Sequence, residues 1–125
     1  MKVAIVNDMF LAVECLRRAV LQSGHVVAWI ARNGEEAVAL AMNNRPDLIL
    51  MDLYMPIMDG VEATRVIRSQ GSRLPIYAMT AHHDEHHANS CRDAGMNGYL
   101  TKPIQADQLK QILQSVSSRQ ADISC

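Results

Sequence analysis

The sequence has few aromatic residues, no excess of charge of one sign and no long apolar run. Aromatic side chains make up 4% of the 125 residues, so Leu, Ile, Val, Ala and the eight Met must fill the core. The twelve Lys and Arg nearly balance the thirteen Asp and Glu. Binding of nucleic acid needs a basic surface. We therefore expect no direct nucleic-acid partner.

Membrane and targeting signals are also lacking. The apolar run at the start of the chain ends at Val6, far short of the ~20 residues of a membrane span. The three cysteines, Cys15, Cys91 and Cys125, have wide spacing without a CxxC pair, which argues against a disulfide framework and indicates thiols in a reducing compartment. We expect a cytoplasmic protein without a membrane partner.

Short apolar runs alternate with helix-length amphipathic segments along the whole chain. Strands are expected at Val3–Val6, Val26–Ile30, Leu48–Met51, Ile76–Met79 and Tyr99–Leu100. Helices are expected at Phe10–Gln22, Glu35–Asn43, Val61–Ser69, Asp84–Ala94 and Gln105–Val116. This alternation predicts one α/β domain, a doubly wound parallel sheet covered on both faces. We expect the domain to span residues 1–118, with a C-terminal tail over residues 119–125.

Four of the expected strands end on polar residues. These are Asn7-Asp8, Asp52, Thr80 and Lys102. Parallel strands all end at one edge of the sheet, so these side chains should converge there. Two carboxylates a few ångströms apart repel by about 1–4 kcal/mol, which a divalent cation relieves. Mg²⁺ suits such a site because it binds one or two carboxylates, waters and phosphate oxygens.

Together these groups predict a site that accepts a phosphoryl group. An Asp can attack phosphorus and form an acyl phosphate. Mg²⁺, Lys102 and Thr80 would then each take one of the three equatorial oxygens. Taken singly, such an Asp is more often a turn or cap residue, and such a Lys a surface cation. The conjunction of four placements favours the site.

Several motifs resemble the receiver domain of bacterial two-component response regulators. They are the run Asp-Leu-Tyr-Met-Pro-Ile-Met-Asp-Gly from Asp52 to Gly60, with Asn7-Asp8, Thr80-Ala81 and Tyr99–Pro103. The resemblance covers about residues 2–116. It implies a (βα)5 flavodoxin-like three-layer sandwich whose five-stranded parallel sheet has the order 2-1-3-4-5.

The resemblance also assigns roles. Asp52 is the implied phosphoacceptor, phosphorylated from the phosphohistidine of a sensor histidine kinase or a histidine phosphotransfer protein. The implied Mg²⁺ ligands are Asp8, Asp52, the backbone carbonyl of Tyr54 and, through a water, Asn7. The remaining implied roles are Lys102 as the phosphate-pairing cation, Thr80 and Tyr99 as switch residues, and Lys102-Pro103 as a cis bond. A downstream effector protein is the implied target. The resemblance leaves open whether phosphorylation also drives dimerisation.

The sequence departs from the family pattern at Asn7, where a second acidic residue is usual. The neutral amide removes one negative charge, so we expect weaker Mg²⁺ binding. Tyr54 and His82 stand two residues beyond Asp52 and Thr80, at positions that flank the attacking water in the family. Both side chains are bulky here, and we expect slow self-dephosphorylation.

The run His82-His83-Asp84-Glu85-His86-His87 spaces two histidine pairs at i, i+4, as in a transition-metal site. No third ligand is fixed by the sequence. The acidic residues favour the first turn of a surface helix with solvated histidines, and we prefer that interpretation.

Two other function classes share parts of this pattern. A Mg²⁺-dependent small phosphatase could use Asp52 as nucleophile, but Tyr54 stands where its acid/base is expected. A flavodoxin-like cofactor binder would need a Ser/Thr/Gly-rich loop in place of the residues from Asn7 to Leu11. We therefore expect no enzyme, but a signalling switch whose only chemistry is self-catalysed phosphoryl transfer and autodephosphorylation.

The pathway is left open by a mixed resemblance. Residues 1 to about 68 look like receivers attached to chemotaxis-type methylesterases, whereas Ala94–Ile104 is similar to receivers of hybrid sensor kinases and phosphorelays. No methylesterase, DNA-binding or nucleotide-cyclase segment follows. We expect the output to come through a partner, or the chain to be a piece of a longer protein.

Overall fold

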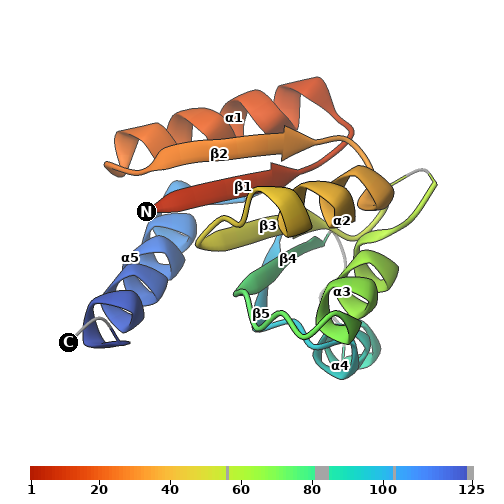
Figure 1. Cartoon of the computed structure of the whole chain (residues 1–125). Helices are drawn as coiled ribbons and strands as arrows, with labels where there is room; N and C mark the ends of the chain where they lie inside the picture. Colours follow the sequence, from red (N-terminus) through yellow and green to blue (C-terminus); the bar gives the residue numbers. More distant parts are fainter. Residues whose placement is uncertain (56, 81–84, 103, 124–125) are drawn as a thin grey trace.

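The computed structural model describes residues 1–55, 57–80, 85–102 and 104–123, in which strands and helices alternate (Figure 1). The strands are β1 (Lys2–Val6), β2 (Val26–Ala31), β3 (Leu48–Asp52), β4 (Ile76–Thr80) and β5 (Gly98–Thr101). The helices are α1 (Phe10–Gln22), α2 (Gly34–Asn43), α3 (Gly60–Ser69), α4 (Glu85–Ala94) and α5 (Ala106–Ile123). No described helix combines the length and apolarity needed to cross a membrane.

The expected elements are all present, and the largest difference is at the end of α5. The sequence predicts that this helix ends at Val116, whereas it continues to Ile123. Val116 is the last position of the apolar stripe and is buried. The residues after Val116 are mostly polar and show no apolar periodicity. The periodicity therefore marks the end of the buried stripe and not the end of the helix.

All five strands are parallel and lie in the order β2-β1-β3-β4-β5, which confirms the expected fold class. Val3 of β1 pairs with Leu48 of β3, and Ile49 of β3 pairs with Ile76 of β4. The centre of the sheet is therefore β3, the strand that ends on Asp52. Its neighbours on the two sides are β1 and β4, which end beside Asn7 and on Thr80.

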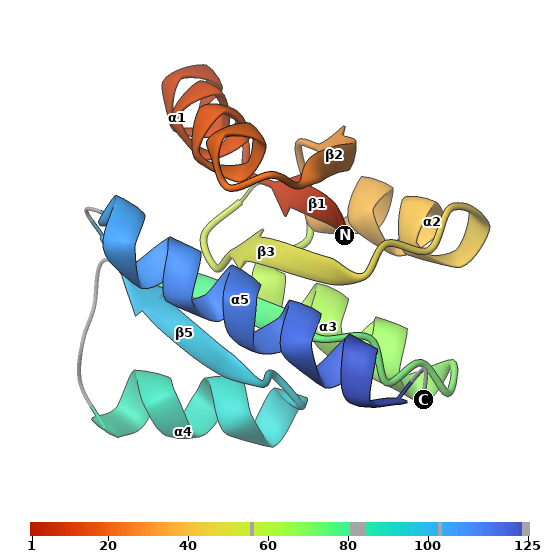
Figure 2. The same cartoon turned by 90° about the vertical axis from the view of Figure 1, so that its left-hand side faces the viewer.

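Two apolar clusters, one on each face of the sheet, form the core. Alternate strand residues such as Ala4 and Val6 pack with α2, α3 and α4, and the intervening residues such as Val3 and Ile5 pack with α1 and α5. In Figure 2, α5 crosses in front of the sheet and α3 lies behind it. Both faces are covered, so the strands are buried and the polar strand ends gather at the rim.

Candidate functional site at the carboxyl edge of the sheet

The predicted site residues follow the ends of adjacent strands, and backbone hydrogen bonds continue the strand pairing past those ends. The N–H of Asn7 donates to the carbonyl of Ala31 at 3.0 Å. The N–H of Lys102 donates to the carbonyl of Thr80 at 2.7 Å. Because the pairing holds up to the last residue of each strand, these side chains are fixed relative to Asp52, which ends the central strand.

Asp52 and Lys102 form an ion pair. The Nζ atom of Lys102 lies 3.0 Å from Oδ1 of Asp52. The Asp52 residue is 2% exposed, whereas 32% of the Lys102 side chain is exposed. The N–H of Tyr54 lies 3.4 Å from the same carboxylate oxygen. The sheet thus holds a buried carboxylate against a cation that can still reach solvent.

Asn7 and Asp8 differ in environment although they are adjacent. Asn7 is 1% exposed, and its Oδ1 accepts a hydrogen bond of 2.9 Å from the N–H of Met9. This contact is an Asx turn that holds the chain between β1 and α1. Asp8 is exposed at the rim. The amide oxygen of Asn7 therefore has a structural partner, whereas the side chain of Asp8 is open to solvent.

The donor set fits Mg²⁺. It comprises the carboxylates of Asp8 and Asp52 and backbone carbonyl groups, all of them oxygen ligands of the kind that Mg²⁺ prefers. Within the described part of the chain, no three His, Cys, Asp or Glu side chains come together as a metal-binding group. Asn7 precedes Asp8 and follows the Val6–Met51 pair of β1 and β3, so an amide and not a third carboxylate occupies the position next to Asp52. A cation here would keep several waters, which is usual for Mg²⁺.

Thr80 and Tyr99 lie on the same face of the sheet. Tyr99 of β5 pairs with Ala78 of β4, and Thr80 is two residues further along β4. Side chains alternate along a strand, so positions two apart point to the same side. Thr80 is buried, and Tyr99 is half-buried against the apolar cluster beneath α4. The two residues expected to switch are neighbours in space.

The loop after Asp52 packs too closely for any residue but glycine at two points. A Cβ on Gly60 would lie 2.3 Å from the backbone oxygen of Asp52, and a Cβ on Gly34 would lie 2.3 Å from that of Met58. The N–H of Gly34 donates to that Met58 oxygen at 2.9 Å. Asp59 caps α3 by accepting from the N–H of Glu62 at 2.8 Å. The Asp-Gly pair of the motif thus fixes the backbone at the site.

Sequence reasoning missed a group of exposed apolar residues around this edge. They are Met9 at 61%, Phe10 at 62%, Leu11 at 76%, Tyr54 at 53% and Ile57 at 76% exposure. We call these five residues the apolar rim. Ile57 has a φ of 71°, which is rare for a β-branched residue. The signal in the sequence was the apolar run that directly follows Asn7-Asp8.

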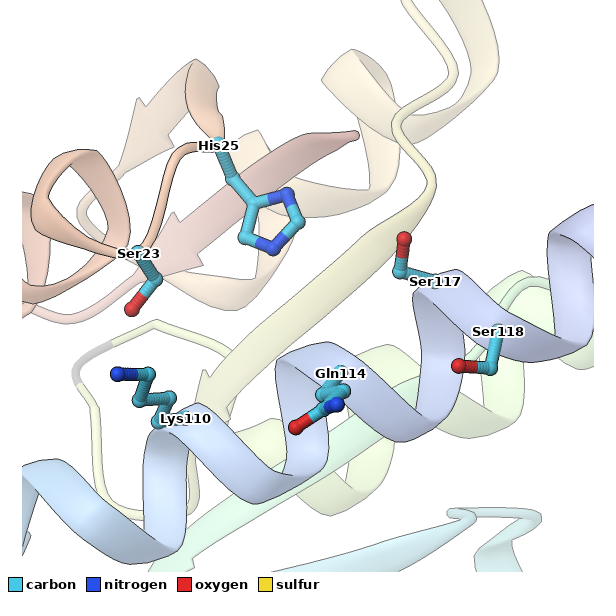
Figure 3. A pocket seen from close by; sticks show the side chains of 6 residues that line it. All are labelled: Ser23, His25, Lys110, Gln114, Ser117 and Ser118. Carbon is cyan, nitrogen blue, oxygen red and sulfur yellow. The ribbon is translucent and has the colours of Figure 1, made fainter.

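One cavity lies far from the phosphoryl site, and another lies beside it. Figure 3 shows one of about 310 Å³ that opens between α5 and the start of β2, lined by Ser23, His25, Lys110, Gln114, Ser117 and Ser118. His25 precedes β2, so this cavity is at the opposite edge of the sheet from Asp52. A second cavity, of about 270 Å³, lies between the loop after Asp52, α3 and α4. The first has no part in the phosphoryl site.

Some predictions lie outside the described residues. They concern the cis bond at Pro103, the shielding of water by His82, and the histidine pairs that include His82 and His83. The side chains of His86 and His87 are likewise not described. These predictions stay untested. Tyr54, the other shielding residue, is described and is more than half exposed.

The family model of the response regulator receiver domain matches residues 3–114. The chain belongs to this family. Receiver domains bind Mg²⁺ for phosphorylation and interact with kinases and effectors. Membership favours the receiver interpretation over the Mg²⁺-dependent phosphatase and the flavodoxin-like binder that the sequence left as alternatives.

Solved receiver structures have the same fold. A Francisella response regulator receiver domain is 25% identical with a TM-score of 0.89, covering 95% of this chain and 98% of the other. Chemotaxis protein CheY4 of Vibrio cholerae is 30% identical with a TM-score of 0.85, covering 92% and 97%. CheY in a CheX-CheY-BeF3-Mg²⁺ complex from Borrelia burgdorferi is 27% identical with a TM-score of 0.87, covering 93% and 88%.

Curated relatives correct one expectation. A protein-glutamate methylesterase/protein-glutamine glutaminase of Pseudomonas fluorescens is 65% identical over 71 residues, which are 56% of this chain and 21% of that protein. Another from Pseudomonas syringae pv. syringae is 50% identical over 86 residues, 68% of this chain and 25% of that protein. The expectation of a switch without enzymatic activity is wrong, because these relatives are named as enzymes. That expectation counted only the effector segments visible in this chain, which spans about a fifth of the relatives' length.

Proposed function

We propose that Asp52 is the phosphoacceptor of this receiver domain and that its phosphorylation switches a protein-binding surface. The observation that supports this most is the buried Asp52 carboxylate in contact with Lys102 at the end of the central strand. In the proposed step, a carboxylate oxygen forms a bond to phosphorus while the N–P bond of a phosphohistidine breaks. The imidazole leaves and takes up a proton. Lys102 then pairs with an oxygen of the transferred group.

The proposed Mg²⁺ ligands are the carboxylates of Asp8 and Asp52 and the backbone carbonyl of Tyr54, with Asn7 acting through a water. When bound, Mg²⁺ supplies charge neutralisation for the phosphoryl oxygens. Asn7 is buried and its oxygen is used by the N–H of Met9, so it adds no charge toward the cation. This supports the hypothesis of reduced Mg²⁺ affinity in this chain.

The proposed switch is Thr80 and Tyr99. The Thr80 hydroxyl would donate to a phosphoryl oxygen on Asp52, and Tyr99 would follow because it lies on the same face of the sheet. Space for this movement is available beside α4. The cavity of about 270 Å³ and another of about 130 Å³, which Tyr99 lines, both include Cys91 of α4. The surface of α4, β5 and α5 is therefore proposed to change on phosphorylation.

The proposed upstream partner is a sensor histidine kinase or a histidine phosphotransfer protein. A phosphohistidine must approach the rim of the sheet to reach Asp52, and the apolar rim surrounds that approach. Exposed apolar patches of this kind mark interaction sites. A cytoplasmic location is also proposed, since the described cysteines, Cys15 and Cys91, are free thiols.

The proposed effector is a methylesterase/glutaminase domain, because 65% identity over 71 residues relates this chain to receivers of that enzyme type. Adding the phosphorylated chain to the Pseudomonas fluorescens enzyme lacking its own receiver should change the rate at which protein glutamate methyl esters are hydrolysed. An unchanged rate would argue for another effector. We also propose that the receiver domain spans residues 1–118 and that residues 119–125 form a C-terminal tail, into which α5 continues as far as Ile123.

The phosphoacceptor is tested by incubating the chain with Mg²⁺ and acetyl phosphate and measuring its intact mass. Wild type should gain one phosphoryl group and Asp52→Asn none. Asp59→Asn is the matched control, because Asp59 is an exposed carboxylate that caps α3 nearby. It should be phosphorylated like wild type. A phosphoryl adduct in Asp52→Asn, or no adduct and no beryllofluoride binding in wild type, would overturn the proposal.

A further inference from the structure

Arg68, in the last turn of α3, joins three segments of the chain. Its Nε donates to the carbonyl of Gly95 at 3.0 Å, one terminal nitrogen donates to the carbonyl of Ser72 at 3.1 Å, and the other donates to Oδ1 of Asn97 at 3.1 Å. All three acceptors are neutral oxygens. The guanidinium is half-buried, and burial lowers its pKa. Such a cation is kept at this position by directed hydrogen bonds, for which the planar fork of arginine is suited.

The turn between α4 and β5 is built around this side chain. Gly95 ends α4 with a φ of 102°, a left-handed conformation that favours glycine. A Cβ at this position would lie 3.0 Å from Cγ and 3.1 Å from Nε of Arg68. The stem of Arg68 therefore packs directly on the glycine while its head binds the carbonyl. We refer to the contacts of Arg68 with Gly95, Ser72 and Asn97 as the clamp.

Asn97, one of the residues bound in the clamp, also holds the start of β5 against β4. The N–H of Asn97 donates to the carbonyl of Ile76 at 2.8 Å, and Oδ1 of Asn97 accepts from the N–H of Ile76 at 3.0 Å. Asn97 Oδ1 is thus shared between Ile76 and Arg68. This side chain supplies a second hydrogen bond to β4 immediately before β5 begins at Gly98.

The register of β5 matters because the strand is short and lies at the edge of the sheet. It has four residues and pairs with β4 from Tyr77↔Gly98 to Thr80↔Thr101. Its two ends are tied to the two ends of β4, by Asn97 to Ile76 and by the N–H of Lys102 to Thr80. A slip by one residue would turn every side chain of the strand to the other face. Lys102 would then leave Asp52.

We propose that Arg68 and Asn97 are positioning residues for the phosphoryl site, which act by fixing the register of β5 and so the place of Lys102 beside Asp52. This inference rests on the proposed role of Asp52 and Lys102. The clamp is at the amino edge of the sheet and the ion pair at the carboxyl edge, with only the four residues of β5 between them. The strand transmits the constraint because it is nearly inextensible.

Four variants test the proposal. Arg68→Gln and Asn97→Ala remove the clamp. Asn97→Asp is the conservative partner, because a carboxylate keeps both acceptor contacts of Oδ1. Arg73→Gln is the matched control, because Arg73 is an exposed arginine in the adjacent loop. Amide hydrogen exchange is measured for β5 and for the rest of the chain, and the rate of phosphorylation by acetyl phosphate is measured at a temperature where every variant is folded.

In Arg68→Gln and Asn97→Ala, exchange should rise by about tenfold or more in β5 and the turn at Gly95, with little change in β1 and β3. The phosphorylation rate should fall with it, while Asn97→Asp and Arg73→Gln should behave like wild type. A uniform rise in exchange, or an unchanged phosphorylation rate despite faster exchange in β5, would overturn the positioning role and leave a structural one. If exchange rose only in β5 of the variants but the wild type itself were never phosphorylated, the proposed role of Asp52 would be refuted instead.

Discussion

The ammonium of Lys102 lies 3.0 Å from the carboxylate of Asp52, although fifty residues separate them in the chain. Asp52 is almost fully buried, and its carboxylate contacts the partly exposed ammonium of Lys102. Breaking a buried ion pair from one side leaves an uncompensated charge, which costs more than removing both partners. Loss of Lys102 alone should therefore cost stability as well as the proposed chemistry.

Replacing Lys102 with Met should lower the free energy of unfolding by about 1–2 kcal/mol. The loss is smaller than for a fully buried pair because 32% of the Lys102 side chain is exposed. The double variant Asp52→Asn, Lys102→Met should recover most of this loss, since no buried charge remains. Urea denaturation of wild type, both single variants and the double variant measures the coupling. If the effects of the two substitutions on the free energy of unfolding were additive, the two residues would not be coupled.

Replacing Asn7 with Asp should tighten Mg²⁺ binding by about tenfold, because it adds a negative charge beside Asp8 and Asp52. Without Mg²⁺ the same variant should be less stable than wild type, since position 7 is 1% exposed and the pairing of Val6 with Met51 puts the new charge next to Asp52. The contact with the N–H of Met9 is preserved, as a carboxylate also accepts it. Calorimetric titration and melting with and without Mg²⁺ measure both effects. Equal or weaker affinity in the variant would refute the hypothesis about Asn7.

Replacing Gly60 with Ala should displace the backbone of Asp52, because the added Cβ would lie 2.3 Å from its carbonyl oxygen. We expect a loss of about 1–3 kcal/mol of stability and slower phosphorylation. Val61→Ala serves as the control, as it alters the same helix turn without that collision. Thermal melts and the intact-mass assay give the two readings. If Gly60→Ala were phosphorylated at the wild-type rate, the loop would not position Asp52.

Cys91 should react with a thiol reagent more slowly than Cys15, by on the order of a hundredfold. Cys15 is exposed, whereas Cys91 is 3% exposed and burial raises the pKa of its thiol. The Cys91 thiol should react only in molecules whose α4 has opened. Raising the pH should therefore speed its reaction only through those open molecules. The variants Cys15→Ser, Cys125→Ser and Cys91→Ser, Cys125→Ser isolate the two thiols for a colorimetric assay. Comparable rates at Cys15 and Cys91 would show that the face of α4 that carries Cys91 is not held against the sheet.

His25 should make the fold less stable as the pH falls below about 6.5. Burial, followed by the positive amino terminus, lowers the pKa of His25 in the folded protein. Between the lowered pKa and 6.5, the unfolded chain therefore binds more protons at His25 than the folded protein does. The free energy of unfolding should fall as the pH falls through this window, and it should be independent of His25 above it. His25→Gln should remove this part of the pH dependence. Urea midpoints at pH 7.5 and 5.5 test it, and an unaltered slope in the variant would argue against the shift.

Much of the fold follows from local patterns. Apolar runs such as Leu48–Met51, and the apolar stripe that ends at Val116, predicted which residues are buried. The spacing of those buried residues predicted the strands and helices found in the structure. The end of α5 escaped prediction because the residues after Val116 are mostly polar and carry no apolar periodicity. The gathering of Asp52, Thr80 and Lys102 at one edge was predictable because parallel strands all end there. The order of the strands was instead implied by the resemblance to receiver domains.

Contacts between distant segments could not be predicted in the same way. Nothing in the local pattern around Arg68 indicates that it binds Gly95 and Asn97, since the choice depends on how α3 and α4 pack together. The apolar rim was missed for a related reason. Leu11 and Ile57 are as apolar as core residues, and only the position of their loops exposes them.

The sequence by itself determined the receiver family, the parallel sheet and which residues end its strands, because periodicity and motif order are written along the chain. Only the tertiary structure decided that Lys102 touches Asp52, that the Asn7 oxygen is taken by the N–H of Met9, and that Arg68 binds Asn97, which in turn binds Ile76 at the start of β4. These contacts join residues through hydrogen bonds of about 3 Å, whose formation depends on the final packing of every intervening element.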